Sequence, residues 1–134
     1  MKIEEENKAL VREAFEQVWN LRHFEKIPEF YSQEYIADYP QMGGHREGHD
    51  GIKELVERAW SACADYHEEL HELIAEGKYV AARLTISGTH TGDVDGFAAT
   101  GKRFETEEIL MLKVQEGKIV WQRGVIDLRP WLHQ

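Results

Sequence analysis

The chain has 134 residues, of which 42% are hydrophobic, and its 25 acidic residues against 16 lysines and arginines give a formal net charge of −9. This length predicts one domain, residues 1–134, with a single buried core, since domains commonly hold roughly 150 residues. The acidic excess excludes the broad basic surface that binds nucleic acid or an anionic membrane, and the longest apolar runs are far shorter than the ~18 residues of a membrane span.

The N-terminal part of the chain predicts helices. Apolar residues spaced by three and four predict an amphipathic helix over residues 3–19. A second, short helix is expected over residues 24–31, with Pro28 close enough to its start to be tolerated. A short strand is expected over residues 35–39, ended by Pro40.

A glycine-rich segment follows. Residues 41–51 hold four glycines and two histidines, which is typical of a loop. We expect this loop to form a flexible pocket rim rather than a phosphate-binding loop, because the lysine and serine or threonine of such a loop are missing. Asp50 is placed to cap the next helix, which apolar spacing predicts over residues 52–63.

From Tyr79 onward the pattern changes from helical spacing to alternation. Strands are predicted over residues 79–90, 104–114 and 118–127, the last two joined by a tight turn. Helices first and antiparallel strands afterwards predict an α+β domain, with the helices packed on one face of a curved sheet.

Residues 66–75 leave two alternatives open. Their apolar spacing continues a helix, and they lack β-branched residues over most of their length, so propensity favours a helix. On a helix, His67 and His71 of the sequence HEELH would share one face, where two imidazoles could bind zinc beside a glutamate base. No third ligand follows at the usual spacing, so we predict no metal site here, nor at the pair His45 and His49.

Strand alternation predicts which polar side chains point inward. His90 ends the apolar face of the strand over residues 79–90, where it is either a core residue or a hydrogen-bonding group of a pocket. Glu108 shares a face with Leu110 and Leu112. It is therefore either a carboxylate in a pocket or one that faces a partner charge at an interface.

The last predicted strand places Arg123 and Asp127 on the face that also carries Ile119. Burial there would raise the pKa of Asp127 towards the range useful for proton transfer. The structural alternative is that Asp127 caps the terminal turn or pairs with Arg123 or Arg129. A β-bulge in this strand would exchange its two faces.

Several stretches, taken together, are typical of one family. They are EQVWN (16–20), LIAEGKYVAAR (73–83), SGTHTG (87–92), ATGKR (99–103), EGKIV (116–120) and VID (125–127). In this order and spacing the chain resembles the SnoaL-like polyketide cyclases (ester cyclases) of the NTF2-like superfamily. The resemblance implies an α+β cone, in which N-terminal helices pack on a strongly curved, mostly antiparallel sheet around a deep apolar pocket. It also implies a homodimer and a strand over residues 66–75.

The resemblance further implies an acid/base enzyme that acts on a small-molecule substrate without metal or cofactor. Asp127 would be the general acid/base of an intramolecular aldol ring closure, and His90 would hydrogen-bond an enolate or carbonyl oxygen. The remaining residues that we expect to bind substrate are Asp38, Arg123, Glu108, Trp121, Tyr35 and Trp19.

Two departures from the family pattern keep other functions open. Asp38 stands where relatives often carry His or Asn, and Arg123 stands where they commonly carry Trp, so the pocket is expected to be more polar than that of a typical cyclase. The alternatives are an isomerase, an epoxide-hydrolase-like enzyme that uses Asp38, Arg123 and Asp127, and a small-molecule-binding module without catalysis.

The single cysteine, Cys63, has no partner for an intrachain disulfide, a pattern typical of a reducing cytoplasm. Residues 1–3 lead directly into a predicted acidic helix rather than into the apolar core of a secretory signal. We therefore expect a cytoplasmic protein.

Overall fold

A computed structural model gives the fold and describes residues 2–39, 44–94 and 96–132. The helices are α1 (Lys2–Ala14), continued by a π-helical segment (Phe15–Asn20), then a 3-10 turn (Phe24–Lys26), α2 (Ile27–Phe30), α3 (Gly48–Ala62) and α4 (Arg129–Leu132). The strands are β1 (Tyr31–Tyr39), β2 (Gly44–Glu47), β3 (His67–Glu76), β4 (Tyr79–Thr89), β5 (Arg103–Gln115) and β6 (Lys118–Ile126).

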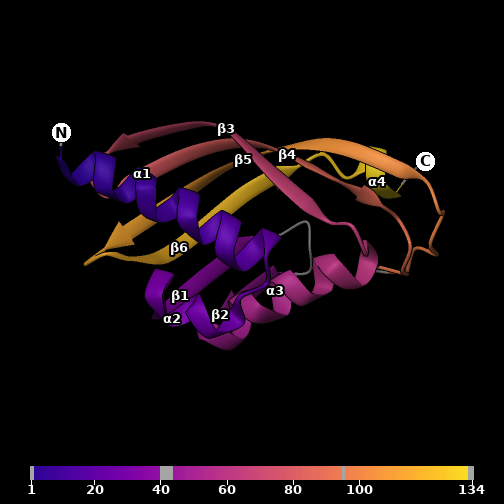
Figure 1. Cartoon of the computed structure of the whole chain (residues 1–134), viewed down its shortest axis with the longest axis horizontal. Helices are drawn as coiled ribbons and strands as arrows, with labels where there is room; N and C mark the ends of the chain where they lie inside the picture. The colour runs from indigo at the N-terminus through magenta and orange to yellow at the C-terminus, as the bar shows by residue number, and fades with distance from the viewer. Residues whose placement is uncertain (1, 40–43, 95, 133–134) are drawn as a thin grey trace.

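The six strands form one curved sheet in the order β2-β1-β6-β5-β4-β3. Neighbouring strands are antiparallel except β1 and β6, which run parallel. The helices α1 and α3 lie on the same side of this sheet (Figure 1). The α+β prediction is confirmed, and among the described residues no helix is long and apolar enough to span a membrane.

Alternation explains the two central strands. Along β4 every second residue from Val80 to Ile86 is buried, and along β5 every second residue from Phe104 to Val114 is buried. Because successive side chains of a strand point to opposite faces, one face of each strand packs into the core under the helices. Both strands were predicted within one residue of their observed bounds.

The strand β6 departs from simple alternation. Ile119 and Gln122 lie three positions apart, a spacing that would place them on opposite faces of a regular strand. Both are nevertheless buried, because Val120 is an extra residue in the pairing of β6 with β5. Beyond such a bulge the faces exchange. Arg123 and Asp127 are therefore exposed, and the prediction that they share the buried face of Ile119 is wrong.

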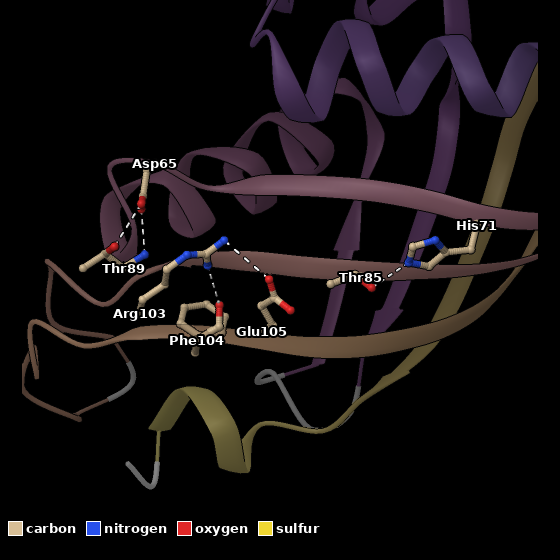
Figure 2. A network of polar contacts seen from close by, with 7 residues as sticks. All are labelled: Asp65, His71, Thr85, Thr89, Arg103, Phe104 and Glu105. Carbon is tan, nitrogen blue, oxygen red and sulfur yellow. Dashed lines mark hydrogen bonds and ion pairs between the residues drawn. The ribbon is translucent and has the colours of Figure 1, made fainter.

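The segment that contains HEELH is the strand β3, so the helical prediction from propensity is wrong and the strand implied by the family resemblance is correct. Pairing with β4 over nearly its whole length overrides the local preference. The helical zinc arrangement of His67 and His71 does not form. His71 instead hydrogen-bonds Thr85 of β4, with 2.7 Å between Nε2 and Oγ1 (Figure 2).

The predicted loop over residues 41–51 is partly wrong. Its second half forms β2 and the first turn of α3, which begins at Gly48 before the predicted cap. His45 contacts Glu47 and His49 contacts the carbonyl oxygen of Tyr31, so the two imidazoles have separate partners. Residues 40–43, which include the predicted strand end, lie outside the described residues.

Candidate active site

The sheet and the helices enclose a small cavity whose free volume is about 20 Å³, room for roughly one water molecule. Trp131 of α4 closes one side: it is 3% exposed and stacks on Phe104 with 4.8 Å between ring centroids. The lining residues are Trp19, Tyr39, Leu55, Ala59, Tyr66, Glu68, Ile86, Glu108, Ile126 and Trp131. Two carboxyl groups therefore face an otherwise mostly apolar space.

Glu108 projects from β5 into this cavity and is 4% exposed. The Tyr39 hydroxyl donates a hydrogen bond to its Oε2 at 2.7 Å. Gln122 donates from Nε2 to the Tyr39 hydroxyl oxygen at 2.6 Å, and Tyr35 donates to Oε1 of Gln122 at 3.0 Å. This chain of donors ends on the Glu108 carboxyl group, which accepts the last hydrogen bond.

Glu68 is the second buried acid, 6% exposed on β3. The Asn20 side chain fixes its backbone: Oδ1 accepts from the Glu68 N–H at 2.8 Å, and Nδ2 donates to the Glu68 carbonyl oxygen at 2.9 Å. The Tyr66 hydroxyl donates to Oε2 of Glu68. Oε1 is buried and has no hydrogen-bond partner within the part of the chain that the structure describes.

Burial controls the protonation of both acids. It raises the pKa of Glu108 to about 7, although the hydrogen bond from Tyr39 opposes the rise. Burial, and then the charge of Glu108, raise the pKa of Glu68 well above its usual range against the hydrogen bond from Tyr66. The pKa values of both tyrosines are also well above 10, chiefly through burial. Near neutral pH, Glu68 is thus a neutral acid and Glu108 is the group that changes charge.

This arrangement suits proton transfer. A carboxyl group that titrates near pH 7 can accept a proton, and a neutral carboxyl group beside it can donate a hydrogen bond to an oxygen. No group of three or more His, Cys, Asp or Glu side chains lies close enough to hold a metal ion anywhere in residues 2–39, 44–94 and 96–132. The carboxyl and hydroxyl groups of the cavity are suited to hydrogen-bonding oxygen-containing organic groups.

Asp127 directly follows β6 and is not buried: its side chain is 42% exposed. Arg129 holds its carboxylate through Nε at 2.9 Å, Nη2 at 2.8 Å and its backbone N–H at 3.1 Å. These hydrogen bonds lower the pKa of Asp127 to about 2. The expected burial and raised pKa are wrong for this conformation, and the structural alternative, a cap and an Arg129 pair, is what forms.

His90 is fully buried beyond the end of β4, in agreement with the predicted inward orientation. Its backbone is held on both sides, by Lys102, whose carbonyl oxygen accepts at 3.0 Å, and by Gly101, whose N–H donates at 2.9 Å. Neither ring nitrogen has a hydrogen-bond partner among the described residues. Like Oε1 of Glu68, the imidazole is therefore a buried polar group whose hydrogen bonds the fold leaves open, but it is not among the residues that line the cavity.

Three residues expected to bind substrate lie on the other face of the sheet. Arg123 donates from Nη1 to Asp38 at 2.6 Å, where β6 runs beside β1. Trp121 lines a shallow surface depression. Because Arg123 bonds Asp38 whereas Asp127 bonds Arg129, the Asp-Arg-Asp arrangement that the epoxide-hydrolase-like alternative requires is not assembled.

The other expected binding residues lie in the protein interior. Glu108 and Trp19 line the cavity, and Tyr35 lies behind it in the hydrogen-bond chain to Glu108. Sequence reasoning assigned no place in a cavity to Glu68 or to the two tyrosines, Tyr39 and Tyr66. Once β3 is known to be a strand, alternation predicts that Glu68 points inward, because its neighbours His67 and Glu69 point outward.

A larger groove of about 890 Å³ lies at the surface between the start of α1 and the hairpin turns of the sheet. Its wall includes exposed side chains such as Glu34, Lys78 and Glu116, and neither buried acid. Water screens charges in such a setting, so these side chains interact only weakly with one another and with a ligand. The interior cavity is the better candidate for chemistry.

Residues 9–134 match the SnoaL-like polyketide cyclase family. The chain is 31% identical over 115 residues to the aklanonic acid methyl ester cyclase of Streptomyces peucetius, which covers 82% of this chain and 77% of that protein. It is 28% identical over 120 residues to the nogalonic acid methyl ester cyclase of Streptomyces nogalater, covering 87% of each.

Solved structures agree with this match. TsrD from Streptomyces laurentii superposes with a TM-score of 0.84 at 25% identity, covering 97% of this chain and 94% of that one. AclR from Streptomyces galilaeus, for which a hydroxylase activity is proposed, superposes with a TM-score of 0.80 at 28% identity, covering 97% and 95%. The cone-shaped fold and the cyclase relatives thus coincide in one chain.

Proposed function

Because this chain belongs to the SnoaL-like polyketide cyclase family, we propose that it closes a ring of a small polyketide ester by intramolecular aldol condensation, without a cofactor. The observation that carries the proposal is the mostly apolar cavity with two inward carboxyl groups. A base removes a proton from a carbon between two carbonyl groups. The resulting enolate attacks a ketone carbon of the same molecule, a C–C bond forms, and the new alkoxide takes a proton back.

Asp127 is the proposed general acid/base, on the strength of its place in the family motif VID. It stands where β6 meets α4, beside the cavity wall formed by Ile126 and Trp131. Substrate enters when α4 moves away, because the closed cavity holds only about 20 Å³. The same movement carries Arg129 away from the carboxylate, which raises the pKa of Asp127 towards that of a useful base.

His90 is the proposed partner of the developing oxygen charge. It is fully buried and its two ring nitrogens lack hydrogen-bond partners among the described residues. His90 is not among the side chains that line the closed cavity, so in this proposal its ring meets the substrate oxygen only after α4 has moved, where a buried donor stabilises the enolate charge. Asp127 then moves the proton, and His90 holds the oxygen.

A binding module without catalysis is the second candidate. The observation that favours it is that Asp127, the proposed base, does not line the cavity and has its pKa lowered to about 2 by its hydrogen bonds with Arg129. In such a module a ligand would displace α4 and be held without any chemical change.

The active form is proposed to be a homodimer that pairs through the outer face of the sheet. Large apolar side chains are exposed there: Val125 is 73% exposed, and its cross-strand partner Ile109 is 54% exposed. Met111 on the same strand is 41% exposed. A second copy would cover this face and remove its apolar surface from water.

The test uses aklanonic acid methyl ester, the compound in the name of one relative, as the first substrate, in the presence of a metal chelator. Wild-type protein should convert it to a cyclised product, which is detected by liquid chromatography coupled to mass spectrometry. Asp127→Asn should lower turnover by about 10²–10⁴-fold, the usual contribution of a general acid/base. Asp93→Asn, which alters an exposed aspartate that bonds only the nearby Ala99 backbone in the described contacts, is the matched control. Full turnover by Asp127→Asn would remove this residue from the mechanism.

A further inference from the structure

The two buried acids of the cavity are held in different ways. On the Glu108 side the hydrogen-bond directions are fixed, because Tyr35 donates to Oε1 of Gln122 and leaves the amide group to donate to Tyr39. The Tyr39 proton can then only point at Oε2 of Glu108. Glu108 is therefore an acceptor supported by a chain of donors, which favours its charged form.

On the Glu68 side one carboxyl oxygen is used and the other is not. Oε2 accepts from the Tyr66 hydroxyl, whereas Oε1 is buried without a partner in the described ranges. A buried polar atom without a hydrogen bond costs about 1–3 kcal/mol, more when it is charged. A proton on Oε1 removes the charge and converts that oxygen into a donor.

Charge decides which acid keeps a proton. The charge of Glu108 raises the pKa of Glu68, Tyr66 and Tyr39 each hydrogen-bond one of the two carboxyl groups, and among the described residues no Lys, Arg or His affects either acid. Two carboxylates in one poorly hydrated cavity repel, so one of them stays neutral. The chain of donors that ends on Glu108 favours its ionised form, whereas Glu68, whose Oε1 has no donor among the described residues, is the acid that keeps its proton.

We propose that neutral Glu68 donates a hydrogen bond from Oε1 to a carbonyl oxygen of the ligand, and that the Glu68–Glu108 pair selects an ester or ketone over a free carboxylate. The inference rests on the proposed function for the cavity as the ligand site, but not on Asp127 or on turnover.

The selection has a simple electrostatic cause. A ligand carboxylate beside ionised Glu108 would place a second negative charge in the cavity, where two negative charges repel. An ester carbonyl accepts a hydrogen bond from Glu68 without adding charge. Asn20 contributes by fixing the backbone of Glu68 through two hydrogen bonds, so the donor keeps its direction. Asn20 is in this sense a positioning residue.

The binding test compares anthraquinone-2-carboxylic acid with its methyl ester on the full-length protein by isothermal titration calorimetry near neutral pH. The ester should bind at least tenfold more tightly than the acid. Glu68→Gln should keep ester affinity, because the amide accepts from Tyr66 and donates from its nitrogen, while Glu68→Met should lower it about tenfold. Glu69→Gln, an exposed neighbour on the opposite face, is the control. Equal binding of the two probes, or failure of the ester to bind, would overturn the ligand assignment.

An infrared measurement tests the proton itself and needs neither ligand nor turnover. The measurement uses Glu108→Gln as the background, because Glu108, with a pKa of about 7, is itself partly protonated near neutral pH. In D2O this variant should show the C=O stretch of a protonated carboxyl group, which is separate from the carboxylate bands. Adding Glu68→Gln should remove the band and adding Glu69→Gln should leave it. Absence of the band in the background variant, or its persistence after Glu68→Gln, would refute the assignment to Glu68. A protein that shows the band and prefers the ester but never forms a product would contradict the proposed cyclase activity alone.

Discussion

Replacing Glu108 by glutamine tests how strongly a buried carboxyl group makes the stability of this protein depend on pH. Burial raises its pKa from 4.5 to about 7. The folded state therefore binds this proton more tightly than the unfolded state does. The contribution of this proton to the free energy of unfolding is fully present below pH 4.5 and is lost as the pH rises through about 7. The difference between the two pKa values corresponds to about 3 kcal/mol, a large part of the 5–15 kcal/mol of a typical domain.

The assay is urea unfolding of wild type and Glu108→Gln at about pH 5 and about pH 8.5, which together span most of this titration. Glutamine keeps an oxygen for the Tyr39 hydroxyl and carries no charge. Between the two pH values the free energy of unfolding should therefore fall by about 2–3 kcal/mol less in the variant than in wild type. Glu105→Gln on the exposed face of β5 is the control and should follow wild type. Identical pH dependence in wild type and Glu108→Gln would refute the assignment of a raised pKa to this residue.

Three further variants test other parts of the account. Trp131→Ala removes the ring stacked on Phe104 and should lower the free energy of unfolding by about 3 kcal/mol. It should also speed the entry of the anthraquinone ester, followed by stopped-flow fluorescence. An unchanged rate of entry would show that α4 does not close the cavity. Asn20→Ala removes both hydrogen bonds to the Glu68 backbone and should cost about 1–3 kcal/mol in urea unfolding; a neutral result would mean that β3 is held without it. Val125→Lys places a charge on the exposed apolar face and should yield monomers in sedimentation velocity, whereas a retained dimer would place the interface elsewhere.

Much of the fold was predictable because its signals are local. The strands β4 and β5 keep strict alternation with no interruption, so their buried faces follow directly from the sequence. The helix α3 keeps a stripe of apolar residues from Ile52 onward. The strand β3 lacked such a signal, because its preference is helical and its conformation is decided by pairing with β4.

The site was less predictable because its determinants are not local. A single extra residue, Val120, moves Arg123 and Asp127 to the exposed side, and alternation alone cannot locate a bulge. The tyrosine partner of Glu108 lies 69 positions away in the chain, on a strand that β6 separates from β5. Buried acids can therefore be proposed from the face of a strand, but their hydrogen-bond partners require the assembled sheet.

The most direct test of the cyclase account is deuterium exchange at the acidic carbon of aklanonic acid methyl ester, followed by proton NMR in D2O with a metal chelator present. Proton removal is the first step of the proposed reaction, so wild-type protein should accelerate the loss of that proton signal over buffer. Asp127→Asn should reduce the acceleration by about 10²–10⁴-fold. Exchange at the buffer rate while the ester is bound to wild-type protein would contradict the account and leave a binding module in its place.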